Sequence, residues 1–160
     1  MPHHFFIKRT DSSDNDFQML VACLDHELWH ELQEDQATYD QHNKVPDLKT
    51  VLIAYDNNQP VACGCFKEFD SDTVEIKRMF VQKAWRGKGL SKKILQGLEE
   101  WAMEKGFNSA VLETSIHFVT ARRLYQTSGY NIVPNYPPYT GLPESVCMRK
   151  ELTKAVNAVL

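Results

Sequence analysis

The chain has 160 residues, the size of one domain, and folding at this length buries roughly 70% of the unfolded surface. Hydrophobic residues at 42% and charged residues at 24% exclude wholesale disorder and a coiled coil. A net charge of −3 argues against a general nucleic-acid binder, and no apolar run reaches the ~18 residues of a membrane helix. The start lacks the pattern of an export signal. We therefore expect one cytoplasmic domain over residues 1–160, with its core at about 5–152.

The N-terminal part predicts a strand followed by helices. A short strand at residues 5–7 precedes a helix that begins at Ser13, which with Asp16 forms a capping-box-like pattern. A second short helix is expected around residues 37–39. Apolar side chains recur at helical spacing along one stripe of the first helix: Phe17, Leu20, Val21, Leu24, Leu28 and Leu32.

The middle of the chain predicts a hairpin, a long strand and an amphipathic helix. Strands at 50–55 and 61–66 flank a turn, and a longer strand follows at 73–81. A basic glycine loop then opens a helix that runs to Lys105 and ends at Gly106. The apolar stripe of this helix contains Leu90, Ile94, Leu95, Leu98, Trp101 and Ala102.

The C-terminal part predicts shorter elements. A strand at 110–114 is followed by a helix at 120–128, which ends at Gly129. Two closing strands, at 130–133 and 146–152, flank a proline-rich loop. Because strands and helices alternate without an internal repeat, the sequence predicts a single α/β domain.

Charge is distributed unevenly along the chain. Nine acidic residues and no lysine or arginine lie between Asp11 and Asp40, whereas seven basic residues and no acid lie between Ile76 and Lys93. A nearly neutral protein with one concentrated cationic stretch suggests a local anion site. The alternative is a solvated helix face with chance clustering.

The four cysteines indicate reduced, buried thiols. Cys63 and Cys65 are separated by one residue on a predicted strand, and Cys23 and Cys147 are distant from them and from each other. This spacing fits neither a disulfide framework nor a zinc site, and no metal is expected.

The basic glycine loop at 86–91 has the parts of a phosphate site. Glycine lets the backbone turn tightly, and amides at a helix start point toward an anion. A Walker loop is excluded because Leu90 follows Gly89. The dinucleotide fingerprint is excluded because Lys92 stands where its third glycine would be.

Two motifs resemble the GNAT superfamily of acetyl-CoA-dependent N-acetyltransferases. Arg86-x-x-Gly89-x-Ser91 is similar to the family's Arg/Gln-x-x-Gly-x-Gly/Ala motif, with Ser91 in place of the last small residue. The segment ARRLYQTSGY at 121–130 is similar to the family's Ala-x-x-Leu-Tyr-x-x-x-Gly-Phe/Tyr segment, although Phe118 stands where the family often has Asn. The resemblance implies an α/β GNAT-like acyl-CoA N-acyltransferase fold, a mixed sheet with splayed fourth and fifth strands flanked by helices.

The resemblance also implies how acetyl-CoA, as cosubstrate, would bind. The pantetheine arm would pair as a pseudo-strand with the backbone of Met79, Phe80 and Val81. The pyrophosphate would bind the loop amides. These amides belong to Arg86, Gly87, Lys88, Gly89, Leu90 and Ser91.

The implied reaction is direct attack of a primary amine on the thioester within a ternary complex, which needs a base and an acid. Glu75 aligns with a catalytic Glu of some members, and strand alternation puts it on the face of Met79 and Val81 unless a bulge intervenes. Tyr125 matches the family Tyr that protonates the thiolate. The alternatives are a surface or salt-bridged Glu75 and a core-aromatic Tyr125.

The acceptor is expected to be a small-molecule amine or a peptide N-terminus. The family places it between the first helices and the loop before the last strands, here Tyr39 and residues 136–139. The acidic run could favour a cationic amine, although an exposed helix explains it equally well. Because dimers are common in the family, a homodimer stands as an alternative to a monomer.

Three other functions compete with this interpretation. A non-catalytic acyl-CoA-binding module would keep the loop without needing Glu75 or Tyr125. An acyl-carrying Cys147 or Cys65 lacks an adjacent histidine in sequence. The third is a zinc hydrolase, because His26-Glu27-Leu28-Trp29-His30 matches the zinc-protease motif. Helical periodicity, however, puts both histidines opposite the apolar stripe, and the extended motif is absent.

Overall fold

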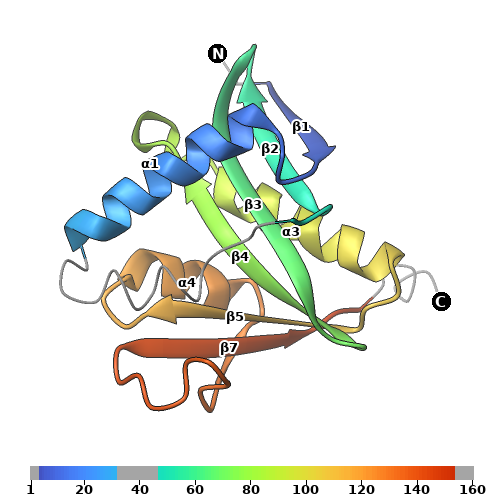
Figure 1. Ribbon diagram of the computed structural model, residues 1–160, viewed down its shortest axis with the longest axis vertical. Coiled ribbons are helices and arrows are strands. Elements are labelled where there is room, and N and C mark those ends of the chain that lie inside the picture. Colours follow the sequence, from blue (N-terminus) through green and yellow to red (C-terminus); the bar gives the residue numbers. More distant parts are fainter. Residues whose placement is uncertain (1–3, 32–46, 154–160) are drawn as a thin grey trace. The chain divides into compact units, whose positions relative to one another are not determined.

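The computed structural model describes residues 4–31 and 47–153, with side chains except those of residues 29–31 (Figure 1). The helix predicted around residues 37–39 and the stripe residue Leu32 lie outside the described residues. Among the helices that are described, none is long and apolar enough to cross a membrane.

In the described residues, seven strands form a mixed sheet in the order β1-β2-β3-β4-β5-β7-β6, accompanied by three α-helices. Strands β4 and β5 are parallel, whereas β1–β2, β2–β3, β5–β7 and β6–β7 are antiparallel. The expected mixed α/β sheet is thereby confirmed. The elements are β1 (Phe5–Thr10), α1 (Asn15–Glu31), β2 (Val51–Asp56), β3 (Gln59–Asp70), β4 (Thr73–Val81), the 3-10 turn η1 (Lys83–Trp85), α3 (Leu90–Glu104), β5 (Ser109–Ser115), α4 (Val119–Thr127), β6 (Asn131–Val133) and β7 (Ser145–Glu151).

The described residues divide into two compact units. The first unit comprises those of Met1–Phe66 and Lys77–Leu98. The second unit comprises those of Lys67–Ile76 and Glu99–Leu160.

In the first unit, helices cover both faces of the β2–β3 hairpin (Figure 1). Phe17 and Leu20 of α1 share a core with alternate residues of β2, among them Ile53. On the opposite face, Leu52 approaches Gly97 of α3. Since successive strand residues point to opposite faces, this double cover explains why the apolar run of β2 is continuous rather than alternating.

Helix α1 begins one residue later than the sequence predicts. The Asp16 amide donates to Asp14 Oδ1 at 2.9 Å, so Asp14 is the N-cap. The Ser13 amide instead donates to Asp11 Oδ1 at 2.9 Å. The capping box expected at Ser13 is therefore wrong.

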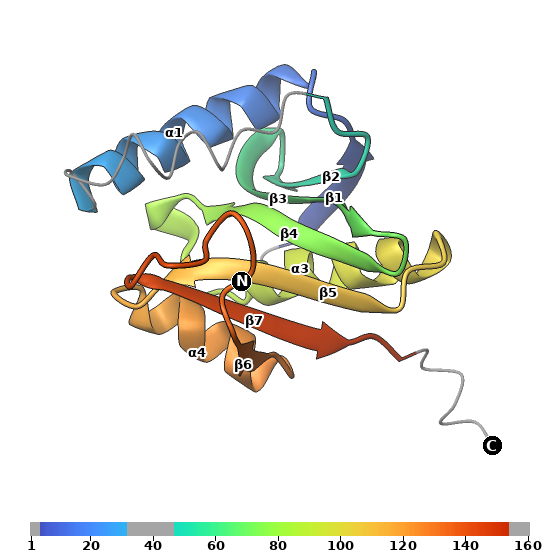
Figure 2. The same cartoon turned by 60° about the horizontal axis from the view of Figure 1, so that its bottom comes forward.

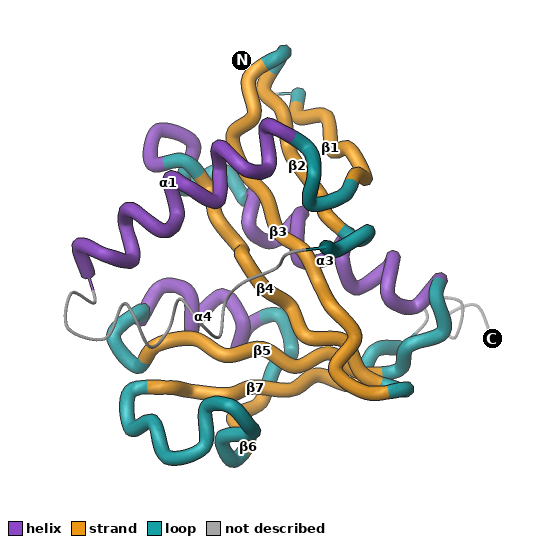
Figure 3. Tube along the Cα trace, viewed as in Figure 1, coloured by secondary structure: helices purple, strands orange, loops and turns teal. Residues whose placement is uncertain are grey.

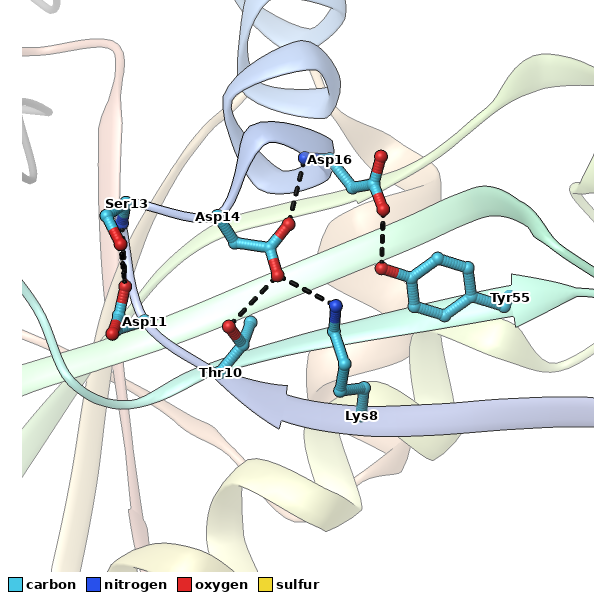
Figure 4. A network of polar contacts seen from close by, with 7 residues as sticks. All are labelled: Lys8, Thr10, Asp11, Ser13, Asp14, Asp16 and Tyr55. Atoms are coloured by element: carbon cyan, nitrogen blue, oxygen red, sulfur yellow. Dashed lines mark hydrogen bonds and ion pairs between the residues drawn. The ribbon is translucent and has the colours of Figure 1, made fainter.

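Contacts from two strands explain why Asp14 takes the capping position (Figure 4). Lys8 Nζ lies 2.8 Å from Asp14 Oδ2, and Thr10 Oγ1 donates to the same oxygen at 3.0 Å. Tyr55 of β2 donates to Asp16 Oδ2 at 2.7 Å. Asp16 therefore binds the sheet with its carboxylate and the N-cap with its amide.

Strand β4 is continuous from Thr73 to Val81, but its regular backbone geometry is interrupted at Arg78, whose φ of +58° is unusual for a residue with a Cβ. Two buried thiols of β3 bind the carbonyls at this interruption. Cys63 Sγ donates to Arg78 O at 3.4 Å, and Cys65 Sγ donates to Lys77 O at 3.3 Å. The sequence predicts that Glu75 and Met79 share a face of β4, because side chains alternate along a regular strand. That alternation does not continue past Arg78.

The cysteine prediction agrees with the structure. All four cysteines are reduced thiols, of which Cys63, Cys65 and Cys147 are buried and Cys23 is half-buried. Burial raises the pKa of Cys63 well above its ordinary value, so this thiol acts as a weak hydrogen-bond donor.

In the second unit, β5 pairs with β7 along its whole length, and β6 lies on the other edge of β7 (Figure 2). A buried polar contact from Glu99 of α3 supports this unit. Tyr130 donates to Glu99 Oε2 at 2.8 Å, and Lys150 Nζ lies 2.9 Å from Glu99 Oε1. Tyr130, the tyrosine of the Gly-Tyr pair that follows α4, therefore has a structural role.

Candidate active site

The predicted phosphate loop is exposed from Arg86 to Gly89 and leads directly into α3. Gly87 and Gly89 have φ values of +82° and +80°, a conformation that glycine adopts without the steric cost of a Cβ. The Lys93 amide donates to Gly89 O at 3.1 Å. The amides just before Lys93 belong to the first turn of α3, where a helix leaves backbone N–H groups without an acceptor inside the helix. Such a turn at a helix N-terminus suits an anion.

The Arg86 side chain, by contrast, is held by protein groups. Its Nε donates to Val81 O at 2.9 Å. Its Nη2 donates to both carboxylate oxygens of Glu27, each at 2.8 Å. The guanidinium carbon lies 5.8 Å from the Phe80 ring centroid. Arg86 thus braces the end of β4 against α1, and the loop backbone is the part that presents donors to an anion.

The contact with Arg86 also bears on the zinc-protease motif. Glu27, the glutamate of that motif, has its carboxylate engaged in this ion pair. His26 is exposed, whereas the side chain of His30 lies outside the described residues. Within residues 4–31 and 47–153, no group of three histidine, cysteine or acidic side chains is arranged to hold a metal ion.

The predicted pantetheine-binding residues follow the interruption of β4. Phe80 and Val81 are buried, and Met79 is half-buried. The Phe80 side chain belongs to the core under α1. Any pairing with a ligand at these positions would therefore use the backbone.

In the second unit, Glu75 is buried, with 3% of its surface exposed, beside two polar side chains. Tyr136 Oη donates to Glu75 Oε2 at 2.8 Å, and Lys67 Nζ lies 3.6 Å from Glu75 Oε1. Burial, and then the Glu75 charge, raise the pKa of Tyr136 far above its ordinary value, so the phenol stays protonated and donates. The prediction that placed Tyr136 on the acceptor side missed this contact, which no local sequence pattern reveals.

The loop that carries Tyr136 joins β6 to β7 and is teal in Figure 3. Asn135 Nδ2 donates to the carbonyls of Tyr139, Leu142 and Ser145 at 3.4, 3.2 and 3.1 Å. The Tyr136 ring packs edge-on against Phe69, with centroids 4.9 Å apart. These contacts fix the phenol beside Glu75.

Tyr125, the predicted acid, lies on α4 with 7% of its surface exposed. Its ring packs edge-on against Tyr130, with centroids 6.0 Å apart. Burial, and then the Glu113 carboxylate, raise the pKa of Tyr125 well above its ordinary value. The phenol is therefore protonated at neutral pH, as a proton donor must be.

The surroundings of Cys147 and Cys65 disfavour the alternative in which one of these thiols carries the acyl group. Burial raises the pKa of Cys147 to about 11, although a backbone hydrogen bond from Tyr136 acts in the opposite direction. The reactive form of cysteine is the thiolate, which is scarce at neutral pH for such a group. Cys65, as described above, is hydrogen-bonded to the backbone of β4.

Comparison with known proteins assigns the chain to a family. The model of the acetyltransferase (GNAT) family matches residues 15–130, which is most of the chain. This chain is a member of the GNAT acetyltransferase family. That membership agrees with the glycine loop, the parallel β4–β5 pair and the helix that carries Tyr125.

Curated proteins resemble this GNAT chain at about one third identity. The uncharacterized N-acetyltransferase YsnE of Bacillus subtilis (strain 168) is 34% identical over 105 residues, covering 64% of this chain and 70% of YsnE. The IAA acetyltransferase of Azospirillum brasilense is 32% identical over 108 residues, covering 67% of this chain and 70% of that protein.

Solved structures share the GNAT fold. A Klebsiella pneumoniae protein assigned as an acyl-CoA N-acyltransferase superposes with a TM-score of 0.77 at 29% identity, covering 93% of this chain and 98% of its own. The yncA structure from Salmonella typhimurium, which contains acetyl-CoA, superposes with a TM-score of 0.68 at 20% identity, covering 94% and 95%. At that identity, the yncA likeness is a likeness of fold.

Proposed function

We propose that this GNAT chain is an N-acetyltransferase that moves an acetyl group from acetyl-CoA to a primary amine, by direct attack within a ternary complex. The observation that carries the proposal is the glycine loop, in which two left-handed glycines deliver backbone amides to the start of α3. Family membership supplies the reaction class.

Cofactor binding uses the backbone on both sides of η1. The pantetheine arm pairs with Met79, Phe80 and Val81, as an added strand pairs with an edge. The pyrophosphate accepts hydrogen bonds from the amides of residues 86–91. Because Glu27 already binds the Arg86 guanidinium, the amides and the helix N-terminus provide the larger share of this recognition.

Proton transfer uses two side chains of the second unit. As the amine nitrogen bonds to the thioester carbon, Glu75 accepts the amine proton. The carbon–sulfur bond then breaks, and Tyr125 gives its phenol proton to the departing thiolate. The products are an N-acetylated amine and CoA with a free thiol. Tyr136 and Lys67 contact the two oxygens of the Glu75 carboxylate and hold it in place.

The test measures free-thiol release from acetyl-CoA across a broad panel of amines. Tyr125→Phe is expected to lower kcat by ~10²-fold or more with little change in acetyl-CoA binding. Tyr130→Phe is the matched control, because Tyr130 packs against Tyr125 but binds Glu99. Unchanged turnover in Tyr125→Phe would remove the acid assignment. Absence of thiol release with every amine, despite acetyl-CoA binding, would favour a binding module.

A further inference from the structure

Arg78, at the interruption of β4, carries a buried guanidinium whose donors are only partly used. Its side chain is 7% exposed, and Nη1 donates to Asp25 Oδ1 of α1. Nε is fully buried and has no hydrogen-bond partner in the described part of the chain. Because arginine stays protonated, an N–H left without an acceptor inside a protein is destabilising.

The geometry of the guanidinium indicates which kind of acceptor would fit this donor. Nε–H and Nη2–H point the same way along one edge of the planar group, and a carboxylate accepts from both in parallel. Asp25 binds Nη1, the nitrogen that is not part of that edge. A purely structural role, in which Arg78 links β4 to α1, explains the contact with Asp25. It does not explain why Nε is buried without an acceptor.

The backbone at this position supports a role for the side chain. A residue with a Cβ is strained in the left-handed conformation, whereas glycine is not. Arg78 nevertheless adopts a φ of +58°, and the Cys63 thiol binds its carbonyl. Conformational strain of this kind is concentrated at binding and catalytic positions.

Arg78 also immediately precedes the strand segment to which the proposed function assigns the pantetheine arm. With the pyrophosphate at residues 86–91, the arm runs back along β4 from Val81 toward Met79. Its acyl end therefore arrives next to Arg78, where the acceptor must meet it. We propose that Arg78 binds a carboxylate of the acceptor, and hence that the acceptors are amines carrying a carboxylate, such as amino acids. This inference rests on the proposed function.

The experiment compares matched acceptors on the full chain, namely L-amino acids and the corresponding L-amino acid amides. Thiol release is measured at saturating acetyl-CoA and corrected for the fraction of neutral amine. Wild type is expected to favour the carboxylate member by about 10–100-fold in kcat/KM, the range for a hydrogen-bonded charge. Arg78→Gln is expected to lose this preference, with activity toward the amides retained. Equal rates for both members in wild type would overturn the proposal, as would a preference that survives Arg78→Gln.

A second measurement covers the case in which Arg78→Gln does not fold, and separates this inference from the proposed function. Wild-type melting temperature is recorded with CoA plus N-acetyl-L-amino acids or their amides, which needs no turnover. Stabilisation by the carboxylate products alone supports the Arg78 site even if no amine is acetylated. Equal effects of acids and amides would overturn it. Asp25→Asn is a further control, since it should alter the preference less than Arg78→Gln.

Discussion

At the scale of single residues, the hydrogen bond from Tyr136 to Glu75 joins side chains that are 61 positions apart. Tyr136→Phe removes that bond and leaves the ring in place against Phe69. Since the bond holds the carboxylate that the proposed function assigns as the base, we expect kcat/KM to fall by about 10-fold while acetyl-CoA binding changes little. Thiol release measures the first quantity, and thermal stabilisation by acetyl-CoA measures the second. Tyr139→Phe, in the same loop, is the control, and an unchanged kcat/KM in Tyr136→Phe would contradict the pairing.

At the scale of an element, the start of α1 depends on Asp14. Asp14→Ala removes the N-cap acceptor, so we expect the free energy of unfolding to fall by about 1–2 kcal/mol. Asp14→Asn keeps a capping oxygen and should recover part of this loss. Urea unfolding at pH 7 measures both variants. Ser13→Ala should cost less than about 0.5 kcal/mol, because Ser13 is not the cap.

The Asp14 carboxylate also makes the folding stability depend on pH. Burial alone would raise the pKa of Asp14, but hydrogen bonds from Lys8, the Asp16 amide and Thr10 outweigh it and lower the pKa below its ordinary 3.8. A lowered folded-state pKa contributes stability that is present above the unfolded pKa and is lost as the pH falls through the folded pKa. The stability gap between wild type and Asp14→Asn should therefore narrow below about pH 4. A gap that is constant from pH 7 to pH 2 would refute this.

The packing of α3 against β3 leads to a further prediction. A Cβ on Gly64 would lie 2.6 Å from Met79 Sδ and 2.7 Å from Ile94 Cγ2. Gly64→Ala should therefore lower the free energy of unfolding by about 1–3 kcal/mol. At Gly97 the close atom is the flexible tip of Leu52, and alanine favours the helix, so Gly97→Ala should be tolerated better.

At the scale of the whole molecule, acetyl-CoA should stabilise the fold. A ligand at 100 times its Kd adds about 2.7 kcal/mol, which for this chain length is roughly 5–10 °C in Tm. Gly89→Ala should weaken this shift by straining the loop at φ +80°. Gly106→Ala strains a left-handed glycine at the other end of α3 and should keep the shift. Equal loss in both variants would mean that general destabilisation, not loop geometry, is the cause.

Much of the fold follows from local patterns. The stripe from Leu90 to Ala102 predicts α3, the alternation and turn residues predict the β2–β3 hairpin, and Gly129 ends α4 with φ +101°. These predictions hold because periodicity and glycine conformation act over a few residues. The extension of β3 to Asp70 was not predicted, since pairing within the sheet decides how far a strand runs. The turn η1 was not predicted either; it is formed by local backbone bonds from Trp85 to Gln82 and from Arg86 to Lys83.

The sequence by itself determined the family, the glycine loop and the order of elements, because each depends on residues close together in the chain. Only the tertiary structure decided that Asp14 caps α1, that Glu27 binds Arg86, that Tyr136 binds Glu75, and that the buried Nε of Arg78 has no acceptor among the described residues. The Glu27–Arg86 and Tyr136–Glu75 contacts join side chains far apart in sequence. The Asp14 cap depends on contacts from Lys8 and Thr10 of β1, and the left-handed conformation of Arg78 is one that strand alternation cannot foresee. Hydrogen bonds form wherever folding brings a donor close to an acceptor, and the spacing of residues in the sequence does not reveal which groups come together.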